Sequence, residues 1–175
     1  MVHYLLPKQL LTKLAGVLAE AKTPWLKNYL IRYFLKKHTV NLQEAVYEEI
    51  DAYESFNDFF VRPLKPGVRP IEAADITSPV DGFVSAFGPI KQGMLIQAKG
   101  HEYSVEELLV SDKATQFYDG SFATLYLSPR DYHRVHMPVT GELIEMHHVP
   151  GRLFSVQPLT TDNIPKLFAK NERLV

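Results

Sequence analysis

The sequence predicts an α+β fold, in which N-terminal amphipathic helices precede an antiparallel β-sandwich or barrel-like body. Within the first forty residues, apolar side chains recur with the period of a helix. Beyond residue 70, short β-rich runs alternate with glycine and proline. The 175 residues allow one domain with an appendage, and the lack of cysteine excludes disulfides, thiolate metal sites and cysteine nucleophiles.

Two short helices are expected in residues 1–40. The first is indicated by apolar residues at the spacing i, i+4, i+7 and i+8, which are Leu10, Leu14, Val17 and Leu18. The second is expected to begin at Pro24, after Thr23 as its cap. Its apolar face has the same helical spacing and comprises Leu26, Tyr29, Leu30, Tyr33 and Phe34.

Charge is distributed unevenly along the chain. Residues 1–40 carry seven Lys and Arg and one acidic residue, whereas residues 41–175 carry 12 Lys and Arg and 19 Asp and Glu. The cations that flank the second helix are Lys22, Lys27, Arg32, Lys36 and Lys37, and Trp25 lies near its start. Basic, aromatic amphipathic helices are typical of an anionic membrane surface, but they could equally pack on the body of the same protein. No nucleic-acid-binding signature is visible, and no apolar run reaches the roughly 20 residues of a membrane span.

An acidic stretch follows, and we expect a helix over residues 42–52. The capping-box spacing of Ser55 and Asp58 predicts a short helical turn that buries Phe56, Phe59 and Phe60. Four breakers then end regular structure, namely Pro63, Pro66, Gly67 and Pro70.

The body is expected to contain four strands, over residues 83–87, 94–98, 123–127 and 143–149. A helix over residues 104–109 interrupts them, because Ser104 and Glu107 have capping-box spacing.

The densest group of polar side chains is the loop at residues 128–138, which includes His133 and His136. Three interpretations are open for it. It could be a structural turn with surface histidines, or a metal site with a third ligand from Asp131, His147 or His148. It could also perform acid–base chemistry, with a carboxylate orienting one histidine.

Asp81 is the best candidate for that carboxylate. Its turn, residues 79–82, has the same Pro-x-x-Gly pattern as the turn directly after His136, so the two segments could lie side by side. The nucleophile is harder to find, because a GxSxG elbow is absent and Gly120-Ser121 has the pattern of a turn into a strand.

Several segments in register resemble the phosphatidylserine decarboxylase proenzymes of bacteria, in their shorter, membrane-associated form. Residues 55–64 are similar to the family's Phe-Asn-x-Phe-Phe-x-Arg segment, and residues 78–82 to its Pro-x-Asp-Gly motif. Residues 98–104 are similar to its Lys-Gly-x-x-Tyr-Ser segment, and residues 126–138 carry the most specific match.

The resemblance implies a pyruvoyl-dependent conversion of phosphatidylserine to phosphatidylethanolamine in phospholipid biosynthesis. A proenzyme would cleave itself at a Gly-Ser bond and leave a pyruvoyl group, whose carbonyl withdraws electrons while CO₂ leaves. Asp81 would orient the base, His136 would be the base for self-cleavage, and His133 would assist decarboxylation or reprotonation. No metal is implied.

The resemblance also implies an organisation and a location. Residues 1–62 would form a membrane-associating helical region, and residues 63–175 the N-terminal part of the β-rich catalytic domain. The protein would lie peripherally on the cytoplasmic face of the cell membrane, on anionic phospholipid. Whether it forms a homodimer stays open.

The sequence departs from the family in one respect. The Leu-Gly-Ser-Thr type of processing motif does not occur in the 175 residues. We therefore expect this chain to be an N-terminal fragment with an incomplete β-body, inactive without the small-chain segment that carries the serine. The alternative is a non-catalytic lipid-binding remnant on the membrane surface.

Overall fold

A computed structural model describes residues 8–175 of the chain, with side chains described from Thr12 onward. The contacts divide it into two compact units, one of Met1–Gly82 with Leu127–Gly141 and the other of Phe83–Tyr126 with Glu142–Val175. The mixture of helices and antiparallel sheets confirms the α+β class, although the sheets of the described residues are two-stranded and do not close into a barrel. The functional boundary expected after residue 62 stays a prediction.

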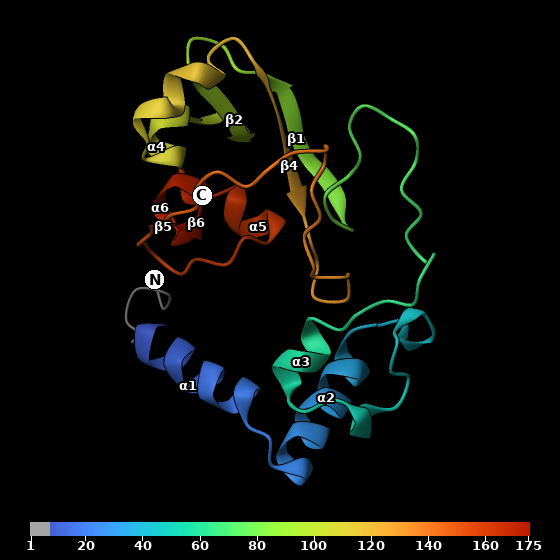
Figure 1. The fold of residues 1–175 in the computed structure, drawn as a ribbon. Coiled ribbons are helices and arrows are strands. Elements are labelled where there is room, and N and C mark those ends of the chain that lie inside the picture. The colour runs from blue at the N-terminus through green and yellow to red at the C-terminus, as the bar shows by residue number, and fades with distance from the viewer. Residues whose placement is uncertain (1–7) are drawn as a thin grey trace. The chain divides into compact units, whose positions relative to one another are not determined.

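The first unit contains the two expected N-terminal helices, α1 (Lys8–Glu20) and α2 (Pro24–Lys37) (Figure 1). Pro24 occupies the first turn of α2, where its missing N–H costs no helical hydrogen bond. Leu10 lies outside the residues whose side chains are described. No helix in the described part of the chain is long and apolar enough to cross a bilayer.

The core of this unit lies where α2 packs against α3 (Phe56–Phe60). Its fully buried members are Ile31, Tyr53 and Phe59. The expected cap of α3 is confirmed, because the Ser55 hydroxyl accepts a hydrogen bond from the Asp58 backbone N–H at 3.1 Å.

The helix expected over residues 42–52 is wrong. Two separate 3₁₀ turns replace it, η2 (Leu42–Glu44) and η3 (Ile50–Ala52). Backbone groups of this segment form hydrogen bonds with residues further along the chain. The N–H of Lys65 donates to the carbonyl of Glu44 at 2.8 Å, and the N–H of Val46 donates to the carbonyl of Pro63 at 2.9 Å. These long-range bonds use backbone groups that a continuous helix would need for itself.

The residues that were expected to form one apolar face of α2 lie on two different sides of the helix. Phe34 packs on the core, whereas Tyr29 and Tyr33 stay exposed on the opposite side with Trp25. Lys27, expected to flank a membrane-facing surface, is only 5% exposed. Its ammonium donates to the carbonyl of Ile50 at 3.1 Å and to the side chain of Asn28 at 2.8 Å, so its predicted role as a surface cation is wrong.

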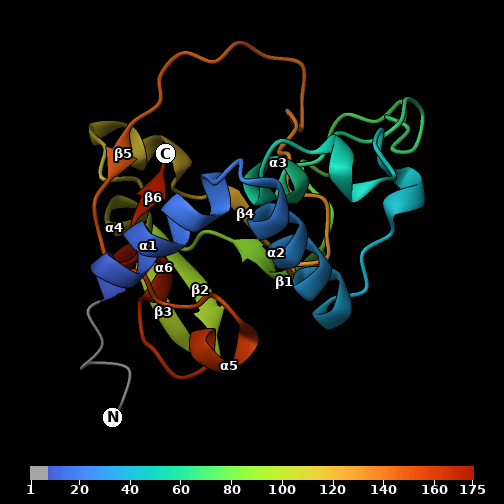
Figure 2. The same ribbon diagram turned by 90° about the horizontal axis from the view of Figure 1, so that it is seen from below.

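The second unit is built on two antiparallel pairs. Strand β1 (Phe83–Pro89) pairs with β4 (Ser121–Tyr126), and β2 (Met94–Ala98) pairs with β3 (His101–Ser104), as Figures 1 and 2 show. β3 was not expected from the sequence. The last residue of β3, Ser104, caps α4 (Val105–Leu109) with the predicted capping box. A further 3₁₀ helix, η4 (Asp112–Phe117), follows. The buried core consists of Ile90, Leu95, Tyr103, Val105 and Ala114.

The fourth expected strand, over residues 143–149, is mostly wrong. Only β5 (His148–Val149) is a strand, and it pairs with β6 (Arg173–Leu174) after two short helices, α5 (Pro158–Thr161) and α6 (Leu167–Lys170). The apolar side chains before it, such as Leu143 and Ile144, are exposed. β-rich composition alone does not make a strand, because the backbone also needs a hydrogen-bonding partner.

Candidate active site

Two backbone hydrogen bonds bring the two candidate segments together within the first unit. The N–H of His136 donates to the carbonyl of Pro79 at 2.8 Å, and the N–H of Thr77 donates to the carbonyl of Pro138 at 2.9 Å. The turn that carries Asp81 therefore lies beside the loop that carries both histidines. These segments are far apart in the sequence, and only the tertiary fold joins them.

The loop has an internal support at its start. The carboxylate of Asp131 accepts from the backbone N–H of Ser128 at 2.7 Å and from the hydroxyl of Ser128 at 2.8 Å. Asp131 thus closes a tight turn around Pro129, which its own backbone N–H also closes by donating to the Ser128 carbonyl at 2.9 Å. Its carboxylate stabilises the loop that presents the histidines.

His133 has a defined tautomer in this arrangement. Its Nδ1 lies 2.8 Å from the carbonyl oxygen of Asp131, and since a carbonyl can only accept, Nδ1 carries the proton. A neutral ring then has its lone pair on Nε2. The ring also packs on Phe60 at the end of α3, with a centroid distance of 4.1 Å. The backbone bond and the ring contact together restrain its orientation.

His136 is exposed, and its Nε2 lies 3.3 Å from the hydroxyl of Tyr132. The Tyr132 side chain is buried, so its hydroxyl is a fixed partner for the imidazole. The two histidines lie three residues apart, but each is oriented by a different group. The two rings are therefore oriented independently of each other.

Asp81 is bound by an arginine that sequence reasoning did not single out. Arg69 donates from Nε to Oδ1 at 2.9 Å and from Nη2 to Oδ2 at 2.7 Å, in the bidentate geometry that matches a guanidinium to a carboxylate. This bonding is the main reason that the pKa of Asp81 lies below its usual value. Partial burial opposes the shift, while the backbone N–H of Tyr132 and the charge of Arg62 support it. The carboxylate is therefore held in its ionised form.

Arg62 is a buried residue just after α3, and it links the end of that helix to the histidine loop. It is 3% exposed, it donates from Nη2 to the carbonyl of Arg130 at 3.0 Å, and it lies over the Phe59 ring at 5.8 Å. Burial lowers its pKa from the ordinary value. Arg134 makes a second tie, from its Nε to the carbonyl of Val61 at 2.7 Å. The two arginines hold the histidine loop against the C-terminal end of α3.

The other residues weighed from the sequence have different partners. In the second unit, His147 Nε2 lies 2.8 Å from the carbonyl of Leu109, and His148 pairs with Glu172 at 3.1 Å. Within residues 8–175, no three His, Asp or Glu side chains are grouped as metal ligands would be. Ser121 begins β4 opposite Pro89, in agreement with the predicted turn into a strand.

Arg69 could have been suspected from its residue type alone, since arginine is the preferred bidentate partner of a carboxylate. No spacing in the sequence links it to Asp81, which lies 12 residues further along. The intervening segment is irregular, so neither a helical nor a strand period predicts the contact.

Comparisons with known proteins agree with the motifs. A family model described as "Phosphatidylserine decarboxylase" matches residues 56–175, and a second, described as "PSD", matches residues 1–39. Proteins named phosphatidylserine decarboxylase proenzyme are similar over nearly the whole chain. The one from Legionella pneumophila strain Corby is 57% identical over 174 residues, and that from Vibrio parahaemolyticus is 56% identical over 178.

These matches cover 98% and 99% of this chain. The chain spans 62% of the length of these relatives. Because one family model alone matches more than half of the residues, the chain belongs to the phosphatidylserine decarboxylase family.

Proposed function

We propose that this chain supplies the acid–base residues of a self-processing, pyruvoyl-dependent phosphatidylserine decarboxylase that forms phosphatidylethanolamine. The observation that carries the proposal is the pairing of the Asp81 turn with the His136 loop through the Pro79 carbonyl and His136 N–H. The structure pairs the backbones of these two segments and keeps the Asp81 carboxylate ionised. An ionised carboxylate that orients an imidazole is the arrangement that activates a hydroxyl nucleophile.

In self-processing, His136 would take the proton from a serine hydroxyl as its oxygen attacks the carbonyl carbon of the preceding residue. The peptide C–N bond then breaks, the proton passes to the leaving amine, and an ester remains. Asp81 would stabilise the imidazolium that forms in between. Its low pKa suits this role, because it remains negatively charged at neutral pH.

The pyruvoyl group, when present, supplies an electron-accepting carbonyl for the loss of CO₂. Among the described residues, His133 has the chemistry to serve such a group. Its Nδ1–H is bonded to the Asp131 carbonyl, so the ring directs its proton-accepting capacity to Nε2. His133 would hold or deliver the proton that replaces CO₂ on the product.

The test uses the complete product of the gene in which these residues are encoded. Intact-mass spectrometry should find two chains, the smaller blocked by pyruvoyl, and the preparation should release CO₂ from phosphatidylserine. Asp81→Asn and His136→Ala should leave one uncleaved chain. His133→Ala should process but decarboxylate slowly.

His148→Gln is the matched control, since that histidine forms a surface pair in the second unit. Decarboxylation by an uncleaved product, or normal cleavage of His136→Ala, would contradict the proposal.

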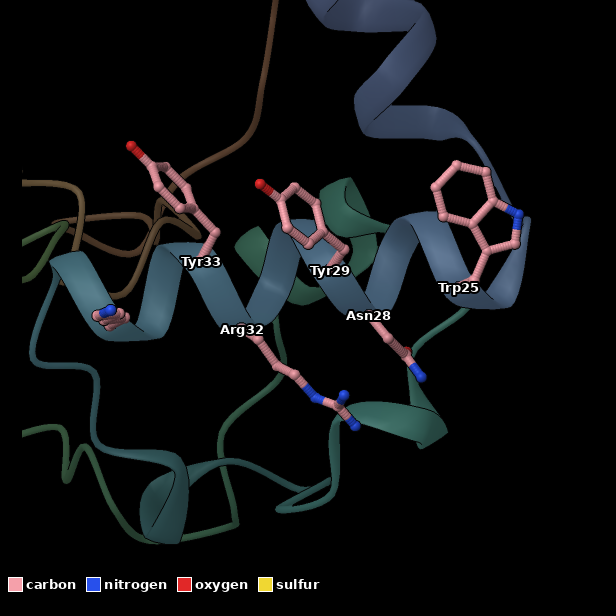
Figure 3. Close-up of a pocket in the computed structure, with 6 residues that line it drawn as sticks. Trp25, Asn28, Tyr29, Arg32 and Tyr33 are labelled. Atoms are coloured by element: carbon pink, nitrogen blue, oxygen red, sulfur yellow. The ribbon is translucent and has the colours of Figure 1, made fainter.

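A peripheral location on the cytoplasmic face of the cell membrane belongs to the same proposal. Its support is the outer face of α2, where Trp25, Tyr29 and Tyr33 project on one side of the helix (Figure 3). Arg32 and Lys36 line the same surface pocket as these aromatic side chains. Exposed aromatic side chains beside cations suit the interface of an anionic bilayer.

Sedimentation with vesicles of phosphatidylglycerol and phosphatidylcholine tests this location. Trp25→Ala with Tyr29→Ala, and separately Arg32→Glu with Lys36→Glu, should both weaken binding, and salt should weaken it further. Lys91→Glu in the second unit is the control. Equal binding by all variants would contradict the proposed membrane location. Vesicle binding by a gene product that never cleaves itself would favour the non-catalytic, lipid-binding alternative.

A further inference from the structure

We propose that Arg69 is a positioning residue for Asp81, and that Glu44, Arg69 and Asp81 act together as one charged support for the His136 site. The inference rests on the proposed function, because the position of Asp81 matters only if the Asp81–His136 pair performs the processing step. It adds two residues, Glu44 and Arg69, that no family motif discussed above contains.

Every nitrogen of the Arg69 guanidinium has a hydrogen-bond acceptor. Nε and Nη2 both bond to the Asp81 carboxylate, and Nη2 also bonds to Oε2 of Glu44 at 2.9 Å. Nη1 donates to the carbonyl of the preceding residue, Val68, at 3.1 Å. All three guanidinium nitrogens therefore have acceptors, and the plane of the group is determined.

Glu44 is itself held in place. Its Oε1 accepts from the side-chain amide of Asn41 at 3.0 Å, and its backbone carbonyl accepts from Lys65 at 2.8 Å. Arg69 is therefore bonded on one side to a fixed carboxylate and on the other to Asp81. A lysine could supply the charge at this position but not the planar fork that orients a carboxylate.

The charged and polar groups around Asp81 come from several segments. Arg69 contacts it directly, Glu44 contacts the far side of Arg69, and Arg62, just after α3, acts at longer range. The N–H of Tyr132 and the paired His136 segment complete the set. Without Arg69, the burial of Asp81 would still raise its pKa while the strongest opposing contact would be lost.

A direct consequence concerns the pH dependence of self-processing. Processing needs a neutral imidazole as base and an ionised Asp81, so the protonation of these two groups together sets the acid limb of the rate profile. Removal of the positive charge of Arg69 favours the protonated form of both groups and moves that limb to higher pH. A residue that only stabilised the fold would instead change the rate at all pH values or change the yield of folded protein.

The experiment measures the rate of self-cleavage against pH for the complete gene product and its Arg69→Gln and Arg69→Lys variants. We expect Arg69→Gln to be slowed about tenfold on the acid side and to recover on the alkaline side, on the scale of a lost charge-assisted hydrogen bond. Arg69→Lys should shift the limb by less. The control is Lys65→Gln, since Lys65 pairs with Glu48 at 2.6 Å and both Lys65 and Arg69 have side chains 42% exposed.

The outcomes separate the two proposals. A wild-type product that does not cleave itself overturns the proposed function and this inference together. Wild-type cleavage that is lost in Asp81→Asn but keeps its pH profile in Arg69→Gln overturns the inference alone. Faster cleavage in Arg69→Gln also overturns the inference, because the bond from Arg69 would then be keeping Asp81 from assisting His136. Should Arg69→Gln fail to fold, Arg69→Lys must still give the smaller upward shift of the acid limb, because it keeps the charge and loses the planar fork. An unchanged profile in that variant overturns the inference.

Discussion

The backbone N–H of His136 donates to the carbonyl of Pro79 at 2.8 Å, so two segments 57 positions apart are joined at the candidate site. Asp81 follows Pro79 by two residues, and the backbone N–H of Tyr132 acts on its carboxylate. The bond forms through main-chain atoms, so it does not depend on which side chains occupy positions 79 and 136. Side-chain substitutions at His136 should therefore change the chemistry while leaving this pairing in place.

Acid should destabilise the first unit partly through Asp81. Its pKa is lowered in the folded state, so its ionisation contributes stability above the unfolded pKa of about 4. That contribution is lost as the pH falls through the lower folded pKa. Thermal melts of wild type and Asp81→Asn over a series of pH values should therefore differ most at neutral pH and converge in acid. A difference independent of pH would contradict this assignment.

Phe59 should be the most sensitive position of the first core. Its side chain is fully buried and contacts the rings of Tyr53, Phe34 and Phe56. Phe59→Ala is expected to cost about 3–5 kcal/mol of unfolding free energy, the usual cost of such a cavity. Urea unfolding measures it. Ile71→Ala, at a highly exposed position, is the control and should change stability by less than about 0.5 kcal/mol.

Lys27 should matter for stability and not for lipid binding. Its ammonium is buried and bonded to the carbonyls of Ile50 and Asp51. Lys27→Met leaves these acceptors without their donor and should cost about 1–3 kcal/mol in urea unfolding. Lys37→Met, at an exposed position of the same helix, should be close to neutral. Weakened vesicle binding by folded Lys27→Met would show that Lys27 reaches the lipid after all.

The cap of α4 offers an independent test in the second unit. The hydroxyl of Ser104 accepts from the N–H of Glu107 at 3.1 Å, and the Glu107 carboxylate accepts in return from the N–H of Ser104. Ser104→Ala should cost about 1 kcal/mol, and Ser104→Thr should retain most of the cap. Equal stability of the Ala and Thr variants would mean that the hydroxyl does not stabilise α4.

Elements with a local cause were predictable from the sequence. α2 begins at Pro24, α3 follows the Ser55 cap, and α4 follows the Ser104 capping box, because each signal acts within one helical turn. The helix expected over residues 42–52 failed for the opposite reason. Its backbone groups bond to residues 63–65, and no local pattern announces a partner that lies some twenty positions away.

The candidate site divides in the same way. The sequence by itself determined which side chains could do chemistry, since Asp81, His133 and His136 stand out by residue type and by motif, and their roles stay predictions. Only the tertiary structure decided that Arg69 holds Asp81, that Lys27 is buried, and that the Asp81 turn lies beside the His136 loop. The physical reason is that a charge takes its partner from whatever the fold brings within hydrogen-bonding distance, and these partners come from segments that the chain brings together only when it folds.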